Sequence, residues 1–211
     1  MILIMAGAIL ARGQGFLNLD FESAYNLPGN PGPNGTLVSV TNALPDWIAY
    51  EGDSVLSEVY YGSNTLDYEA GPELEGGSLA FSGNFSVGLY QNSEISQTGL
   101  VPAHAESLEF EASGPDDSLL PEATGFSVTL GGQTLSYTEI SEGPNYFVYG
   151  VNIPTAMDAQ MEAWNFSCEN PGTGQVLLDN IEFSTMSIPE PSECGLVGIA
   201  VIALGVLRRR K

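Results

Sequence analysis

The stretch "QVLLDNIEFS", residues 175–184, shows most directly how this chain folds. Apolar and polar residues alternate in it, and successive side chains of a β-strand point to opposite faces of the sheet. The alternation predicts that Leu177, Asp179, Ile181 and Phe183 share one face. If that face lies inward, Asp179 is a carboxylate among core side chains, and it needs hydrogen bonds or a cation to offset the loss of water.

Segments of the same kind recur along the chain, separated by Gly, Pro, Asn and Asp residues that favour turns. About ten short strands without a helical period are typical of a two-sheet antiparallel sandwich, and we expect a jelly roll. Neither an internal repeat nor a long linker divides the body, so we predict one all-β domain over residues 16–186. The predicted strands are 16–22, 55–62, 77–83, 85–91, 105–112, 125–132, 133–140, 146–153, 161–168 and 175–184.

Charge is distributed very unevenly along the chain. There are 26 Asp and Glu residues against 5 Lys and Arg residues, which gives a formal net charge of -21. The basic residues are Arg12 and, at the other end, Arg208, Arg209, Arg210 and Lys211. Phosphate groups are bound through Lys and Arg, so a body without them excludes nucleic acids and anionic membrane surfaces as its partners. An acidic body favours solubility, cations and neutral partners.

The residue inventory leaves little room for catalysis. His104 is the only histidine, so a His-based metal cluster is impossible and any Ser-His-Asp triad would depend on this one residue. The sequence has neither the "GxSxG" turn of many serine hydrolases nor the "GxxxxGK" phosphate loop. We therefore expect no catalytic residues. Paired carboxylates, as in glycoside hydrolases, are the remaining enzymatic alternative.

Aromatic side chains offer a second alternative, a carbohydrate-binding module, because exposed rings stack on the apolar faces of sugars. Trp47 and Tyr50 lie in "LPDWIAYEG", in an expected loop or strand start. Most aromatic residues of a sandwich lie in its core, and Trp47 is the better candidate for an exposed ring that binds a ligand together with Tyr50. Trp164 alternates with Phe166 in "WNFS" and is predicted to lie in the core.

Both ends of the chain carry apolar segments. Residues 1–15 resemble the apolar and cleavage regions of a secretory signal peptide, but the usual basic region is missing, so we expect the natural start to lie upstream of Met1. Residues 195–207 form a predicted transmembrane segment of about 20 Å as a helix, short for a bilayer core of roughly 30 Å. The basic residues 208–211 that follow favour a cytoplasmic end and an external body.

Residues 187–211 combine three features in order: the box Pro189, Glu190 and Pro191, then the apolar run, then "RRRK". This order resembles the PEP-CTERM sorting signal, which bacterial exosortases recognise and cleave. The resemblance implies an exported protein that is held briefly in the inner membrane and then reaches the cell surface, outer envelope or extracellular matrix. It implies an exosortase-type enzyme and exopolysaccharide as partners. We therefore expect a non-enzymatic structural or adhesive role.

The body shows a broader resemblance. The segments "FLNLDFE", residues 16–22, and "VLLDNIEFS", residues 176–184, resemble the first and last strands of galactose-binding-like jelly rolls. In that family a structural Ca²⁺ often lies near these strands, which implies Asp20, Glu22 and Asp179 as calcium ligands here. The residues themselves leave another interpretation open, in which Asp20 and Glu22 are solvated and Asp179 accepts backbone hydrogen bonds.

Overall fold

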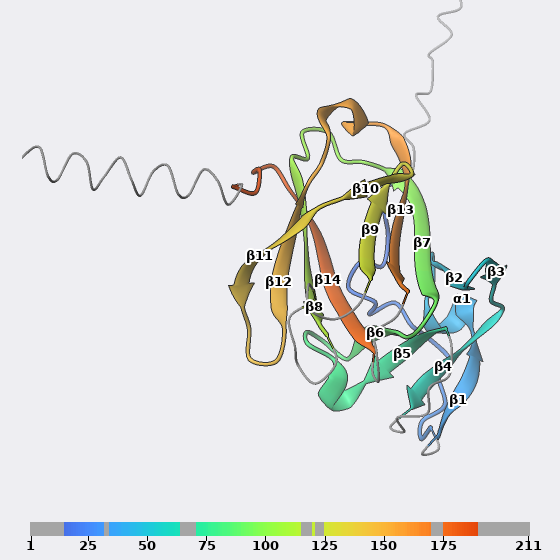
Figure 1. Cartoon of the computed structure of the whole chain (residues 1–211). Helices are drawn as coiled ribbons and strands as arrows, with labels where there is room; N and C mark the ends of the chain where they lie inside the picture. The colour runs from blue at the N-terminus through green and yellow to red at the C-terminus, as the bar shows by residue number, and fades with distance from the viewer. Residues whose placement is uncertain are drawn as a thin grey trace, which may run out of the picture.

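The computed structural model is a sandwich of two β-sheets (Figure 1), which confirms the prediction of an all-β body with two mainly antiparallel sheets. Within the described part of the chain, no helix is long and apolar enough to cross a membrane. The predicted signal peptide, except Gly15, lies outside this part, as do Glu190, Pro191, the predicted transmembrane segment 195–207 and the basic residues 208–211. The structure describes residues 15–31, 34–63, 71–114, 120, 125–169 and 175–189.

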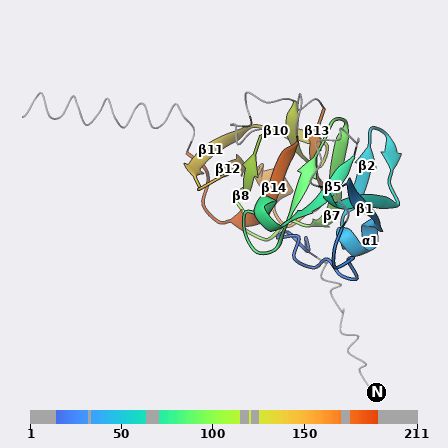
Figure 2. The same ribbon diagram turned by 90° about the horizontal axis from the view of Figure 1, so that it is seen from below.

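The larger sheet has eight strands in the order β1-β4-β5-β6-β14-β8-β12-β11, and Figure 2 shows this order from the side of β11 to that of β1. Neighbouring strands are antiparallel except β4 and β5, which are parallel. The strands of this sheet are β1 (Asn34–Ser39), β4 (Glu58–Ser63), β5 (Pro72–Gly76), β6 (Phe85–Leu89), β8 (Ser107–Ser113), β11 (Tyr137–Glu142), β12 (Phe147–Asn152) and β14 (Val176–Ser184).

The smaller sheet has six antiparallel strands in the order β10-β9-β13-β7-β2-β3. Its strands are β2 (Ile48–Glu51), β3 (Ser54–Val55), β7 (Ser93–Leu100), β9 (Phe126–Leu130), β10 (Gln133–Leu135) and β13 (Met161–Cys168). The described helices are short: α1 (Val40–Ala43) and the 3-10 helices η1 (Gly77–Leu79) and η3 (Thr155–Met157).

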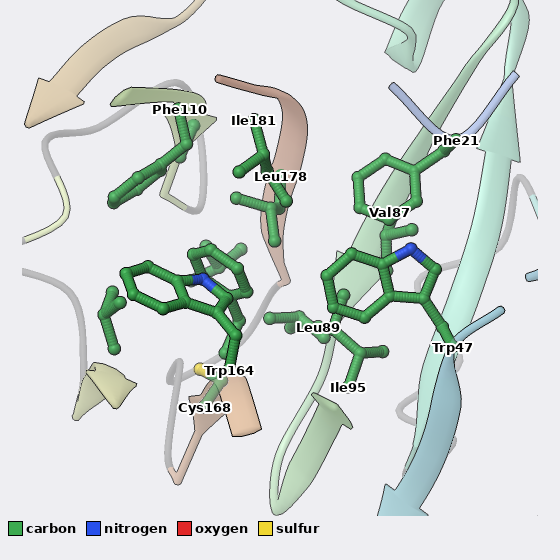
Figure 3. Close-up of a cluster of buried hydrophobic side chains, with 14 of the residues drawn as sticks. Phe21, Trp47, Val87, Leu89, Ile95, Phe110, Trp164, Cys168, Leu178 and Ile181 are labelled. Carbon is green, nitrogen blue, oxygen red and sulfur yellow. The ribbon is translucent and has the colours of Figure 1, made fainter. Parts of the chain in front are cut away.

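The hydrophobic core lies between the two sheets. Phe110 of β8 in the larger sheet contacts Phe126 of β9 and Phe166 of β13 in the smaller one, with ring centroids 6.0 and 5.5 Å apart. Trp164 of β13 is 1% exposed, which confirms its predicted place in the core (Figure 3). Burial of each large apolar side chain contributes about 1.5–3 kcal/mol, so this shared core holds the sheets together.

Two predicted strands are wrong. Residues 16–22 form turns, because Asn18 and Phe21 have positive φ values of 49° and 57°, which a strand does not allow. Residues 77–83 contain η1 and irregular backbone. The strands β1, β2, β5 and β7 were not among the predicted segments, since their polar and glycine residues obscure the alternation.

A bulge in β14 changes which of its residues face the core. The register with β8 shifts after Asp179, and Asn180 has a φ of 45°. As a result Leu178 and Ile181 both join the core (Figure 3). Asp179 is next to Leu178 in the strand and therefore points to the outer face of the sheet. The common face predicted for Asp179 and Ile181 is wrong, because the bulge interrupts the two-residue period.

Candidate functional site

Glu22 holds the connection between β5 and β6, residues 77–84, which we call the β5–β6 loop. Its Oε1 accepts hydrogen bonds from the backbone N–H groups of Asn84 (2.6 Å) and Phe85 (2.8 Å), and its Oε2 accepts one from the side chain of Asn84 (2.8 Å). Burial acts to raise the pKa of Glu22, but the hydrogen bonds favour the ionised form and the net effect is a lowered pKa. Asp20 lies beside it, and its Oδ1 accepts the backbone N–H of Glu22 at 3.3 Å.

Asp179 holds the same loop from β14. It is fully buried, its Oδ2 accepts the N–H of Ser82 at 3.1 Å, and its Oδ1 accepts the N–H of Asn180 at 2.7 Å. The interpretation of Asp179 as an acceptor of backbone hydrogen bonds is confirmed. In the described ranges, no group of three or more Asp, Glu, His or Cys side chains is placed to hold a metal ion. Calcium binding by Asp20, Glu22 and Asp179 stays a prediction, and N–H donors already bond both carboxylate oxygens of Glu22 and of Asp179.

Four buried acids lie on the outer face of the larger sheet: Glu73 and Glu75 of β5, Glu111 of β8 and Asp179 of β14. We call them the acidic face. Leu74, between the first two, belongs to the core, so the acids of β5 point away from it. Glu111 lies directly opposite Asp179 in the register of β8 and β14, so these two side chains share a face. The β5–β6 loop contacts Asp179 through Ser82, and Glu111 lies beside Asp179.

Burial controls the charge of the acidic face. It raises the pKa of Glu75 and of Glu111, and it raises the pKa of Asp179 to about 7. The part of the chain that the structure describes contains no Lys or Arg that could compensate these charges. Among the described residues, Glu75 Oε1 and Glu111 Oε2 are buried without a hydrogen-bond partner. Of these acids, Asp179 can therefore exchange a proton close to neutral pH.

Trp47 belongs to the core, so the expectation that its ring is exposed is wrong. It is 4% exposed, and its ring centroid lies 5.6 Å from that of Phe21 and 6.4 Å from that of Phe166 (Figure 3). Its indole N–H donates to the backbone carbonyl of Asn18 at 2.9 Å. Tyr50 is half-buried on β2. Because the ring of Trp47 is covered by residues near the start of the chain, the predicted pair offers no stacking surface to a sugar.

The chain leaves the sandwich after β14 through residues 185–189, which we call the exit segment. Asn152, the last residue of β12, contacts Ile188 twice: its Oδ1 accepts the backbone N–H at 2.7 Å, and its Nδ2 donates to the backbone carbonyl at 3.0 Å. Pro189, the first residue of the predicted sorting box, follows directly and is exposed. Sequence reasoning missed Asn152 because its partner lies 36 residues away.

His104 lies on the surface beside the exit segment. It lines a pocket of about 380 Å³ together with Asn152, Asp158 and Ser187. Its backbone N–H donates to Asp158 Oδ1 at 2.7 Å, and its φ of 67° places it in a turn. His104 therefore holds the turn in place through its backbone N–H.

No protein-family model matches this chain, and neither a curated protein nor a solved structure does. The features that bear on its function are the sorting-like C-terminal sequence, the acidic face with the adjoining β5–β6 loop, and the exit segment.

Proposed function

We propose that this chain is an exported bacterial protein that an exosortase-type enzyme processes at a PEP-CTERM sorting signal. The observation that carries the proposal is the order of the Pro189, Glu190 and Pro191 box, the apolar run 195–207 and the basic residues 208–211. These positive charges follow a body without Lys or Arg, and such asymmetry favours a cytoplasmic end and an external body. The anchor is transient, and the processed protein resides at the cell surface, in the outer envelope or in the extracellular matrix.

The proposed role of the body is structural or adhesive rather than catalytic. A net charge of one sign keeps a protein soluble and favours neutral partners and cations. In this proposal, an exopolysaccharide matrix provides such partners. The sandwich is proposed to be a jelly roll of the galactose-binding-like kind, on the pattern of residues 176–184 alone, because residues 16–22 do not form a first strand.

The intact mass of the mature protein from the outer fractions of the native host tests the sorting proposal. We expect a mass that lacks the apolar run and "RRRK". A Glu190→Ala variant should retain both, whereas a Glu182→Ala control, which changes an exposed acid of β14 outside the box, should be processed like the wild type. A wild-type mass that includes residues 195–211 would overturn the proposal.

A lectin-like role is the second candidate, and a pocket of about 400 Å³ on the larger sheet favours it. Tyr61 of β4 and Phe85 of β6 line this pocket beside Asn84, with ring centroids 6.2 Å apart in an edge-to-face arrangement. Aromatic rings and amides are the groups that bind neutral sugars. Glycan-array binding that is lost in Tyr61→Ala but kept in Tyr25→Ala, a ring that does not line the pocket, would support the role. A wild-type protein that binds no glycan would contradict it.

A further inference from the structure

The exit segment is bound to the sandwich at alternate residues. The hydroxyl of Ser107 donates to the carbonyl of Met186 at 2.7 Å, and Asn152 binds both backbone groups of Ile188. The side chain of Met186 is 72% exposed, so it is the backbone of this residue that is held. These hydrogen bonds hold the segment against the surface, although it bends at Thr185 and Met186 and is not itself a strand.

The two hydrogen bonds of Asn152 reproduce the pairing of a β-ladder. A side-chain amide carries a donor and an acceptor side by side, as the N–H and C=O of one residue do in a hydrogen-bonded pair of antiparallel strands. Because the N–H of Ile188 requires an oxygen and its carbonyl requires an N–H, the pair also fixes the orientation of the amide. Both backbone groups of Ile188 are thereby occupied, so this residue cannot pair with another strand through them.

The side chain of Ile188 adds an apolar contact to this pair. It lies on Gly150 of β12, where an added Cβ would be 2.6 Å from its Cδ1 and equally 2.6 Å from the Cδ1 of Ile140. Ile188 is accordingly half-buried, whereas the residues on both sides of it are exposed. The absence of a side chain at Gly150 allows this close approach.

Pro189 directly follows Ile188. Proline has no backbone N–H, so it cannot donate the next hydrogen bond. Among the described residues, Ile188 is the last one hydrogen-bonded to the sandwich, and it directly precedes the first residue of the sorting box.

We propose that Asn152 and Gly150 form an anchor for Ile188 that sets the limit of processing, so that the cut falls on the C-terminal side of Ile188. This inference rests on the proposed function. A processing enzyme needs an extended backbone whose polar groups are accessible, and the anchor withholds those of Ile188. The step is the hydrolysis of one peptide bond, in which water supplies the hydroxyl of the new carboxyl group and a proton to the new amine. Asn152 acts as a positioning residue, through the segment that it holds.

Limited proteolysis of the full chain in detergent, followed by intact-mass measurement, tests the anchor directly. With a protease of broad specificity, the wild type should be trimmed to a product that still contains Ile188. Asn152→Ala removes both hydrogen bonds to Ile188. Gly150→Ala places a methyl group where the side chains of Ile188 and Ile140 now lie. We expect the protease to trim each variant further than the wild type, toward Ser184, and roughly tenfold faster. Gly29→Ala, which has open space around it, is the control and should behave like the wild type. Equal trimming of all four proteins would overturn the anchor.

The C-terminal residue of the mature protein in the native host then tests the position of the cut. A product that ends at or after Ile188 supports the inference. A product that lacks the apolar run but ends before Ile188 overturns it, while the sorting proposal stands. A product that retains the apolar run defeats the sorting proposal and with it the processing limit, whereas the proteolysis result still decides whether the anchor exists.

Discussion

Asp179 and Glu22 hold the same loop, but their environments shift their pKa values in opposite directions. Asp179 is buried and faces Glu111, so the folded protein binds its proton more tightly than the unfolded chain does. Its contribution to the free energy of unfolding is greatest below its ordinary pKa of 3.8 and is lost as the pH rises through about 7. The pKa of Glu22 is lowered, so its contribution is present above the ordinary value of 4.5 and is lost as the pH falls.

Asp179→Asn should therefore flatten the decrease in stability between mildly acidic and neutral pH. In the wild type, burial raises the pKa of Asp179 from 3.8 to about 7. Ionisation of this residue between these two pH values should therefore lower the free energy of unfolding by roughly 2–4 kcal/mol. Urea unfolding at a series of pH values measures it. Glu22→Gln is the control of opposite sign, and it should lower stability by about 1 kcal/mol at pH 7 and less at pH 3. An Asp179→Asn protein as sensitive to pH as the wild type would argue against the raised pKa.

Trp47 ties the first described residues to the core. Trp47→Ala should lower the free energy of unfolding by about 3–5 kcal/mol, because it leaves a cavity against Phe21 and Phe166. Trp47→Phe keeps much of the packing but removes the N–H that binds the carbonyl of Asn18, so it should cost less, about 1–2 kcal/mol. Denaturant unfolding compares the two. A Trp47→Ala protein as stable as the wild type would mean that the ring does not pack as described.

The β5–β6 loop illustrates how one element is held by several others. Glu22 comes from the opening segment, Asp179 comes from β14, and the hydroxyl of Ser86 in β6 donates to the carbonyl of Leu79 within the loop. Glycine allows the loop to follow this path, since Gly77 and Gly83 have φ values of 66° and 69°. The loop has little regular structure of its own, so its position depends on these side chains.

The two glycines provide a matched comparison. Alanine at either position should cost about 1 kcal/mol for its backbone conformation. At Gly83 the added Cβ would also overlap the carboxylate of Glu22, whereas at Gly77 it meets open space. We expect Gly83→Ala to be more destabilising than Gly77→Ala by about 1 kcal/mol, in thermal or chemical unfolding. In a Glu22→Ala background the difference should disappear. Its persistence there would show that Glu22 is not the cause.

Strand prediction succeeded where alternation was plain and failed where it was not. The segment 161–168 coincides with β13, and 175–184 covers β14. β5 contains two glutamates in five residues, and such a sequence does not predict a strand buried on both faces. The path of the β5–β6 loop could not be predicted either, because it is set by Glu22 and Asp179, which lie far away in the chain.

At the scale of the whole molecule, repulsion among acids opposes folding. The net charge is -21, and no positive side chain lies between Gly13 and Leu207. Like charges repel more strongly in the compact state than in the unfolded chain, so folding is opposed at low ionic strength. The three acids of the acidic face whose pKa values are raised reduce this repulsion when they bind protons.

Salt should stabilise this protein. Raising NaCl from about 0.01 to 0.3 M shortens the range of electrostatic repulsion, and we expect the melting temperature to rise by several degrees. Calorimetry or circular dichroism measures this rise. At matched ionic strength, CaCl₂ that stabilises the protein beyond MgCl₂, and loses this advantage in Glu22→Gln, would support the predicted calcium site. Equal melting temperatures in the two salts would contradict that site, and a melting temperature independent of NaCl would contradict the repulsion.

The sequence by itself determined the all-β class, the base-free body, the core position of Trp164 and the likeness of the C-terminal residues to a sorting signal. These properties depend on composition and on spacing within a few residues, which a chain displays directly. Only the tertiary structure decided that Trp47 is buried, that Asp179 points outward and holds a loop, and that Asn152 holds Ile188. Each of these depends on contacts between residues far apart in the chain, or on a bulge that shifts the alternation by one residue, and local spacing contains neither.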